Sequence, residues 1–281
     1  CWVSYPEMAR LVGARPVFAE TRLSAPPGAG SESATGGFQI TGRALRAVLT
    51  DRTKAVLINT PGNPTGHALD AAEAREIADF AVEHNLIIIT DEIYEMIRYR
   101  RPHLSMAAQP GCAERTLTVN GLSKAHAMTG WRLGYLAGPT GLVGELVKAQ
   151  QHTAGCAGSF VQAGGVAALT GSDDHVAAMT AEYAARAALL VDGLDALPGM
   201  RCAHPDGAFY AFPDISGTGF ASSADFAAWL LRAAGVAVTP GSAFGPGGEG
   251  HVRLSFATSP QILKEALDRM AAALRTRTGR Y

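Results

Sequence analysis

Short apolar runs that alternate with helical patterns through the first 140 residues constrain the fold of this chain more than any other feature. The runs expected to form strands are residues 16–20, 55–59, 86–91, 116–120 and 132–137. Each run is continuous in apolar residues, which is typical of parallel strands buried on both faces. The sequence therefore predicts an α/β protein with a mainly parallel sheet flanked by helices.

The helix between the second and third of these runs has a clear start signal. Asp70 and Glu73 have the spacing of a capping box, and Ile77, Phe80 and Ala81 follow at helical intervals. This pattern predicts a helix that ends near Asn85.

The pattern changes after about residue 141. Long helices are expected over residues 142–152 and 173–197 and should connect two domains. The final part mixes short strands with helices, an α+β pattern; the strands are expected at 207–212, 236–238 and 251–256, and the helices at 223–234 and 260–274. We expect a large domain over residues 1–165 and a smaller C-terminal α+β domain over 166–281. The segment 24–37, rich in Pro, Gly, Ser and Ala, is expected to be a surface loop.

Composition excludes several classes of partner. The chain has 281 residues and a formal net charge of -1, so it offers no basic surface for nucleic acid and no polybasic segment for a membrane. It also lacks an apolar run of the ~20 residues that a membrane helix requires. The cysteines Cys1, Cys112, Cys156 and Cys202 are scattered, which indicates reduced thiols in a cytoplasmic protein. Neither these cysteines nor the histidines have metal-ligand spacing, so we expect no metal and a small-molecule partner.

The segment NGLSKAHAMTGWRLGY, residues 120–135, places Lys124 just after an apolar strand and Arg132 eight residues later. A lysine amine attacks carbonyl groups, and an arginine fork binds a phosphate dianion through paired hydrogen bonds. Pyridoxal 5′-phosphate carries both groups and is the cofactor that this pair suggests. A solvated lysine and arginine near a strand end is the alternative for any isolated pair of this kind.

Two upstream motifs support the cofactor interpretation. NTPGNPTG, residues 59–66, follows an apolar strand with a Pro/Gly turn that would hold the Asn63 amide rigidly, although a plain turn is an equal alternative. LIIITDEIY ends a buried strand in Asp91, followed by Tyr94. A carboxylate in apolar surroundings requires a partner, either a protonated pyridine nitrogen or a structural salt bridge.

Taken in order, NTPGNPTG, DEIY and SKAHAMTGWRLGY resemble the class I/II aminotransferases of the fold-type I pyridoxal-phosphate superfamily, most closely the bacterial aspartate aminotransferase type. The resemblance covers essentially the whole chain, from CWVSYPEM at the start to HVRLSFATS near the end. It implies the fold-type I architecture and transfer of an amino group from an amino acid to a 2-keto acid through a Lys124 Schiff base.

The resemblance also assigns roles to individual residues. It implies that Asp91 pairs with the ring nitrogen and that Tyr94 and Asn63 bond the ring hydroxyl. The other implied binding residues are Ser123 and Arg132 for the phosphate, Trp2 for the ring face and Arg253, with Asn63, for the substrate. Taken alone, Trp2 would be ordinary packing and Arg253 a surface ion pair.

The chain begins abruptly at Cys1, so we expect the N-terminal part of the large domain to be missing. The resemblance implies a homodimer for the full-length protein. Two other functions stay open: a pyridoxal-phosphate-dependent lyase on the same fold, and a truncated fragment without catalysis. The reaction products distinguish a lyase from an aminotransferase, since a lyase releases ammonia.

Overall fold

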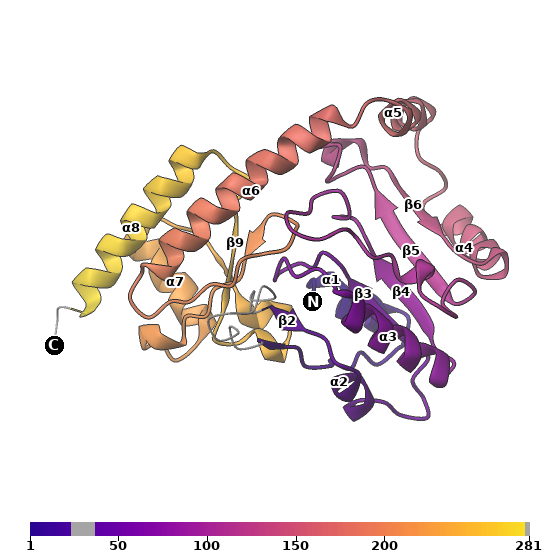
Figure 1. Ribbon diagram of the computed structural model, residues 1–281, viewed down its shortest axis with the longest axis horizontal. Coiled ribbons are helices and arrows are strands. Elements are labelled where there is room, and N and C mark those ends of the chain that lie inside the picture. Colours follow the sequence, from indigo (N-terminus) through magenta and orange to yellow (C-terminus); the bar gives the residue numbers. More distant parts are fainter. Residues whose placement is uncertain (24–36, 279–281) are drawn as a thin grey trace. The chain divides into compact units, whose positions relative to one another are not determined.

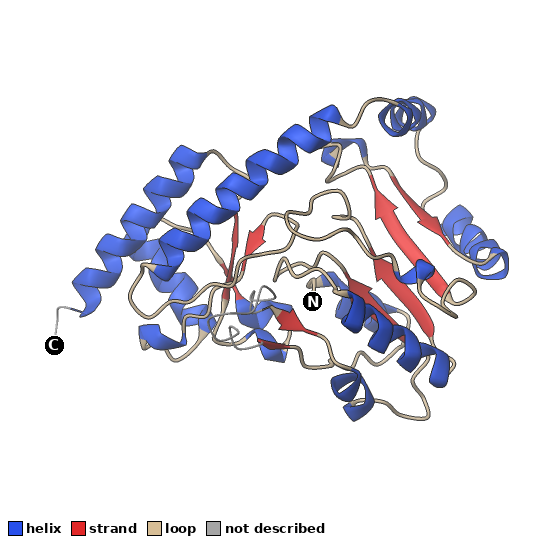
Figure 2. Ribbon diagram, viewed as in Figure 1, coloured by secondary structure: helices blue, strands red, loops and turns tan. Residues whose placement is uncertain are grey.

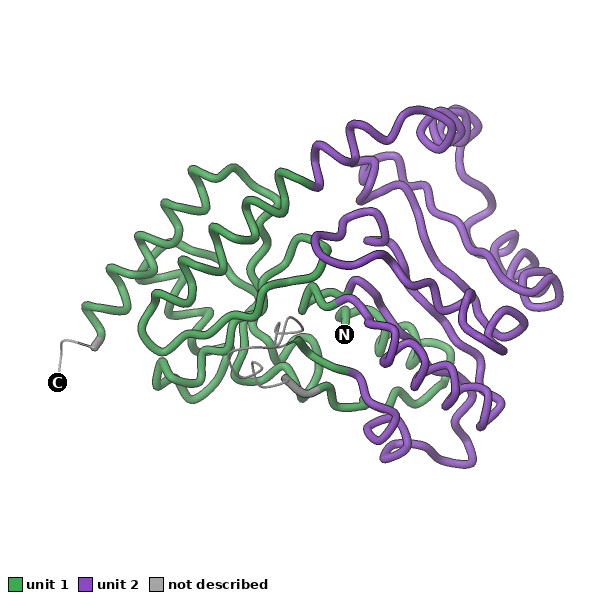
Figure 3. Tube along the Cα trace, viewed as in Figure 1, with its two compact units in different colours: residues 1–39, 62–67, 181–281 green, residues 40–61, 68–180 purple. Residues whose placement is uncertain are grey.

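The computed structural model describes residues 1–23 and 37–278, and the chain divides into two compact units (Figure 3). Unit 1 comprises residues 1–39, 62–67 and 181–281, and unit 2 comprises residues 40–61 and 68–180. The domain boundary expected at residues 165–166 stays a prediction. Except for Gly37, the expected loop 24–37 lies outside the described residues.

Unit 2 contains a four-stranded sheet in the order β3-β4-β5-β6 (Figure 1). The strands are β3 (Ala55–Asn59), β4 (Ile87–Asp91), β5 (Thr116–Gly121) and β6 (Gly134–Ala137). The first three strands are parallel, as the continuous apolar runs predict. In the register, Asn59 pairs with Asp91, and Asp91 with Val119, so these strands end at one edge of the sheet.

The last strand differs from the expectation, because β6 runs antiparallel to β5 and begins at Gly134 rather than at residue 132. Gly121 faces Gly134 in this pairing, and a Cβ on Gly121 would lie only 2.9 Å from the Gly134 Cα atom. Two glycines therefore permit a backbone approach that side chains would prevent.

The helix α3 (Ala71–Glu83) confirms the predicted capping box. The Asp70 carboxylate accepts a hydrogen bond from the Glu73 backbone N–H at 2.9 Å, and the Glu73 carboxylate accepts one from the Asp70 N–H at 3.0 Å. Ile77, Phe80 and Ala81 are buried, as their helical spacing predicts. The capped end thus fixes where α3 begins after the NTPGNPTG segment.

The remaining helices agree with the sequence in part (Figure 2). Expected helices appear as α4 (Thr140–Thr153), α6 (Asp174–Asp195), α7 (Ser223–Ala234) and α8 (Pro260–Thr278). Short or weakly patterned helices are unpredicted, namely α1 (Ser4–Leu11), α2 (Gly42–Ala47) and α5 (Ser159–Thr170). Single-turn 3-10 helices are Met106–Ala108, Thr129–Trp131, Ser216–Thr218, Gly241–Phe244 and Pro246–Gly248. Among the described residues, no helix combines the length and apolarity needed to cross a membrane.

Unit 1 contains a three-stranded sheet in the order β7-β9-β8, formed by β7 (Tyr210–Ala211), β8 (Thr239–Pro240) and β9 (Val252–Ser255). All its pairings are antiparallel. The strand expected at 236–238 is wrong, because β8 begins at Thr239, where pairing with β9 starts. The strand expected at 207–212 is reduced to β7, whose two residues pair with Ser255 and Leu254 of β9.

The first predicted strand, residues 16–20, is also wrong. These residues form no regular structure, and Val17 is 55% exposed. A short antiparallel pair, β1 (Arg22–Leu23) and β2 (Phe38–Gln39), follows instead. An apolar run forms a strand only where a neighbouring backbone supplies hydrogen bonds, and among the described residues none pairs with 16–20.

A buried carboxylate fixes the chain just after β4. Glu92 is 1% exposed, and its Oε1 atom accepts hydrogen bonds from Thr90 Oγ1 at 3.2 Å, Ser105 Oγ at 3.1 Å and the Met106 N–H at 3.2 Å. Its Oε2 atom lies 2.7 Å from His103 Nε2. The charge is thus stabilised by four groups, which tie residues 103–106 to the end of the strand that carries Asp91.

Replacing Glu92 by Ala should lower the free energy of unfolding by about 3 kcal/mol, because the donors that face its carboxylate lose their acceptor inside the protein. Urea denaturation would measure the change. Glu182→Ala is the matched control, since its carboxylate pairs with Arg186 on the exposed surface of α6, and it should change stability by less than about 0.5 kcal/mol. Equal midpoints for Glu92→Ala and the wild type would contradict the role given to Glu92.

A second carboxylate supports the start of α7 in unit 1. Glu249 Oε1 accepts hydrogen bonds from the backbone N–H of Ser223 at 2.6 Å and of Gly250 at 3.0 Å. The Gly250 N–H, followed by the Ser223 N–H, holds the pKa of Glu249 below its ordinary value of 4.5. An anion at a helix N-terminus is also favoured by the helix dipole.

This lowered pKa predicts a pH dependence of stability. Between the lowered folded pKa and 4.5 the unfolded chain binds more protons at Glu249, so the stabilisation is complete above 4.5 and is lost as the pH falls through the folded value. Denaturation midpoints measured from about pH 6 to about pH 3 should fall less steeply for Glu249→Gln than for the wild type. Glu145→Gln, on the surface of α4, serves as control, and identical slopes for Glu249→Gln and wild type would refute the prediction.

Candidate functional site

Lys124 lies in the turn that follows β5, close to the edge where β3, β4 and β5 end. Its Nζ atom is 6.0 Å from the centre of the Tyr94 ring, which is 3% exposed. Tyr94 belongs to the turn after β4, so parallel neighbours bring the two residues together. The structure therefore assembles Asp91, Tyr94 and Lys124 at one edge of the unit 2 sheet.

Asp91 ends β4 in a defined geometry. Its Oδ1 atom accepts a hydrogen bond from the Ile93 N–H at 3.1 Å. Its carbonyl oxygen accepts bonds from the Thr60 N–H at 3.0 Å and from Asn59 Nδ2 at 2.9 Å. These contacts fix the backbone of Asp91 on both sides, and the half-buried carboxylate is held at the strand end.

Ser123 follows the paired end of β5, and Arg132 precedes the paired start of β6. Gly121 pairs with Gly134, and the Leu122 N–H donates to the Leu133 carbonyl oxygen at 3.3 Å. Arg132 is exposed and has left-handed backbone, with φ of 56°, and its Nη1 donates to the Thr129 carbonyl oxygen at 2.9 Å. The Ser123 hydroxyl and the Arg132 guanidinium are both donors suited to a phosphate.

Asn63 lies in unit 1, in a turn that is tight as predicted. The Gly62 N–H donates to the His67 carbonyl oxygen at 2.9 Å, and the Gly66 N–H to that of Gly62 at 2.7 Å. Gly66 has φ of +69°, and a Cβ there would meet Pro205 at 2.4 Å, so only glycine fits. The turn holds the buried Asn63 amide in a single place.

Arg253 occupies β9 in the same unit and contacts Asn63 directly. Its Nη1 donates to Asn63 Oδ1 at 2.9 Å, and its Nη2 donates to Thr239 Oγ1 at 3.3 Å. The centre of its guanidinium lies 4.6 Å from the Tyr210 ring and 4.9 Å from the Phe244 ring. The alternative of a surface ion pair is wrong, since an amide, a hydroxyl and two rings surround this cation.

Trp2 precedes α1 in unit 1 and is half-buried. Its ring meets the ring of Tyr5 edge to face, with centres 5.3 Å apart. The Cys1 amine donates to the Phe244 carbonyl oxygen at 3.0 Å, which attaches the start of the chain to the segment beside Arg253. The half-exposed indole keeps surface available for stacking.

Thr239, Tyr210 and Phe244 receive no role from the sequence, although all three contact Arg253. The strand expected at 236–238 stops one residue before Thr239 and so misses its pairing with Arg253. Correct placement of β8 would have been the signal that identifies Thr239.

Two other regions contain residue types found in binding sites, but their polar side chains are already bonded within the protein. Among the described residues, Glu92, Glu95 and His103 have possible ligand atoms within 4.8 Å of one another. However, Glu92 is saturated by donors, and Glu95 Oε1 accepts a bond from Asn120 Nδ2 at 2.7 Å. This cluster acts as a hydrogen-bond network.

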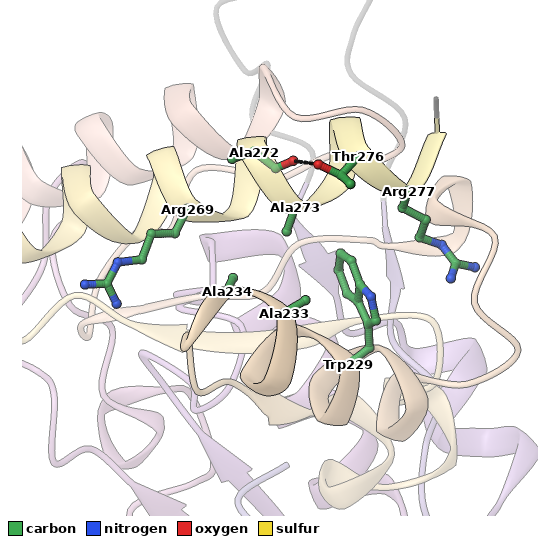
Figure 4. A pocket seen from close by; sticks show the side chains of 8 residues that line it. All are labelled: Trp229, Ala233, Ala234, Arg269, Ala272, Ala273, Thr276 and Arg277. Atoms are coloured by element: carbon green, nitrogen blue, oxygen red, sulfur yellow. Dashed lines mark hydrogen bonds between the residues drawn. The ribbon is translucent and has the colours of Figure 1, made fainter. Parts of the chain in front are cut away.

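A groove of about 770 Å³ lies between α7 and α8 (Figure 4). It is lined by Trp229, Ala233, Ala234, Arg269, Ala272, Ala273, Thr276 and Arg277, none of which is a predicted site residue. Thr276 Oγ1 donates to the Ala272 carbonyl oxygen at 2.9 Å, Arg269 pairs with Glu265, and Arg277 lies 3.9 Å from the Phe220 ring centre. The groove offers no converging reactive groups.

Comparison with known proteins identifies the relatives of the chain. The profile of the family described as aminotransferase class I and II matches residues 1–270. A curated aspartate aminotransferase from Musicola paradisiaca is 46% identical over 276 residues, which are 98% of this chain and 66% of the relative. The chain spans about two thirds of the length of the curated relatives that it matches.

Solved structures agree with this relationship. An aromatic aminotransferase from Pyrococcus horikoshii OT3 aligns with a TM-score of 0.92 at 42% identity, over 99% of this chain and 72% of that one. An aspartate aminotransferase from Thermus thermophilus with maleate aligns with a TM-score of 0.88 at 38% identity, over 97% and 67% of the two chains. The predicted fold-type I architecture is confirmed, and the chain belongs to the class I and II aminotransferase family.

Proposed function

We propose that the chain carries the catalytic machinery of a pyridoxal-phosphate-dependent aminotransferase, which moves an amino group from an amino acid to a 2-keto acid. The proposal depends above all on Lys124, whose amine lies 6.0 Å from the Tyr94 ring centre near the end of the strand that carries Asp91. An amine, a phenol and a carboxylate at one sheet edge are the groups that this chemistry requires.

The donor set of unit 2 fits pyridoxal phosphate group by group. When bound, the cofactor supplies a carbonyl that condenses with amines and a ring that takes up electrons from the substrate α-carbon. Lys124 would hold it covalently, and the Asp91 carboxylate would keep the ring nitrogen protonated. Ser123, after the end of β5, and Arg132, before the start of β6, would bind the phosphate, and Tyr94 would bond the ring hydroxyl.

The residues of unit 1 complete the proposed assignment. Asn63 would share the ring hydroxyl with Tyr94 and contact the substrate, and Trp2 would stack on the ring face. Arg253 would bind the substrate α-carboxylate, because a guanidinium has five N–H groups and, within the described part of the chain, Asn63 and Thr239 accept from two of them. The amine of Lys124 would also move the substrate α-proton.

The substrates and the state of the protein are parts of the same proposal. Aspartate is the proposed donor, since relatives from Musicola paradisiaca and Pyrococcus abyssi are named aspartate aminotransferases. Free cysteines at all four positions support a cytoplasmic location. We propose a homodimer for the intact protein, and the net charge of -1 supports a partner that is neither nucleic acid nor membrane.

Replacing Lys124 by Ala should lower the rate of amino transfer from aspartate to 2-oxoglutarate by at least about 10⁴-fold, because the variant lacks the group that moves the α-proton. The visible absorbance of the lysine-bound cofactor should disappear as well. Lys148→Ala, on the exposed surface of α4, is the control and should retain both signals. Transfer at the wild-type rate by Lys124→Ala would rule out the proposed mechanism, and release of ammonia by the wild type would favour a lyase.

A further inference from the structure

The side chain opposite Arg253 on the neighbouring strand is set by the sheet register. β8 and β9 are antiparallel, and Thr239 is the direct partner of Arg253. Directly opposed residues project from the same face of a sheet. The Thr239 hydroxyl therefore reaches Arg253 Nη2, from which it accepts a hydrogen bond of 3.3 Å.

The guanidinium is restrained in other directions too. Asn63 Oδ1 holds Nη1 at 2.9 Å, and the rings of Tyr210 and Phe244 lie 4.6 Å and 4.9 Å from the guanidinium carbon. Rings at this distance restrict movement of the guanidinium group, but they do not accept directional hydrogen bonds from its N–H groups. The direction of the N–H fork is consequently fixed by the two oxygen acceptors, Asn63 and Thr239.

The Arg253 donors are incompletely used within the protein. A guanidinium has five N–H groups in a fixed planar fork. Nη1 and Nη2 each have a protein acceptor, whereas Nε is buried and has no hydrogen-bond partner among the described residues. An arginine that was only structural would be expected to satisfy its buried donors. The spare donors indicate that this arginine is positioned for a ligand.

We propose that Thr239 is a positioning residue: it fixes the guanidinium fork of Arg253 in the orientation that binds the substrate carboxylate. The inference rests on the proposed carboxylate-binding role of Arg253. A fork held in place at both terminal nitrogens loses less conformational freedom when it binds a planar carboxylate. Thr239 makes no contact with the reacting atoms in this role, so it acts on binding and leaves proton transfer unchanged.

The decisive comparison is Thr239→Val, which keeps the shape of the side chain and removes the acceptor, against Thr239→Ser, which retains the hydroxyl. The probe is maleate, the dicarboxylate named for the Thermus thermophilus structure, and calorimetry on the cofactor-loaded protein measures its Kd. Thr239→Val should weaken maleate binding about tenfold and Thr239→Ser by less than about threefold, since a hydrogen bond to a charged donor is lost only in the first.

Kinetics give a second readout that loss of structure would not imitate. Thr239→Val should raise KM for both the amino acid and the keto acid about tenfold while kcat stays within about twofold. Thr170→Val is the matched control, because the Thr170 hydroxyl donates only to its own helix at the Val166 carbonyl oxygen. Unfolding midpoints of all variants establish that they are folded.

The outcomes separate this inference from the proposed function. Arg253→Met should weaken maleate binding about 100-fold; unchanged binding would overturn the proposed role of Arg253 and with it the inference. If Arg253→Met weakens binding but Thr239→Val binds maleate as the wild type does, Thr239 is not a positioning residue while the proposed function stands. A Thr239→Val variant with a lowered unfolding midpoint and unchanged maleate affinity would likewise overturn the inference.

Discussion

The parallel register of β3, β4 and β5 is the constraint on which the arrangement of unit 2 depends. Because Asn59, Asp91 and Val119 lie side by side, the segments that follow these strands all leave from one edge of the sheet. These strands consist mainly of apolar residues, and the polar residues Asn59 and Asp91 stand at the ends of β3 and β4. The Lys124 amine thereby comes to lie 6.0 Å from the centre of the Tyr94 ring, although the two residues follow different strands.

Glu92 and Arg253 differ in how far the protein satisfies their polar atoms. Glu92 is buried and contacts four groups of its own unit, so its carboxylate serves to hold the backbone. Arg253 has acceptors at both terminal nitrogens, whereas its buried Nε atom has none among the described residues. The two side chains therefore differ in how many of their polar atoms the protein itself satisfies.

The sequence predicted the elements whose signals are local and strong. The capping box at Asp70 located α3, and the apolar runs located β3, β4 and β5 within one residue at each end. The strand predicted at residues 16–20 was wrong because strand formation depends on a neighbouring strand, which an apolar run does not reveal. The antiparallel direction of β6 was not predicted, for a related reason. It depends on the close approach of Gly121 in β5 to Gly134 in β6, which a single run of sequence does not show.

The site residues with strong local signals were likewise predicted, and those that depend on strand pairing were missed. Lys124, Asp91 and Tyr94 were found because each follows directly on a strong strand signal, and the structure brings them to one edge. Thr239 was missed because its contact with Arg253 depends on the start of a two-residue strand. The roles of Trp2, Ser123 and Arg132 rest on the family resemblance and stay predictions.

The Asn63 turn also has a consequence for dissecting the protein. Residues 62–67 belong to unit 1, whereas the strand before them and the helix after them belong to unit 2, so neither unit is a single stretch of sequence. A C-terminal piece excised at residue 181 would keep Arg253 and Thr239 but leave Asn63 behind. The hydrogen-bonded group of Asn63, Thr239 and Arg253 therefore cannot be transplanted by one cut in the gene, and exchanges between homologues must carry residues 62–67 together with the C-terminal segment.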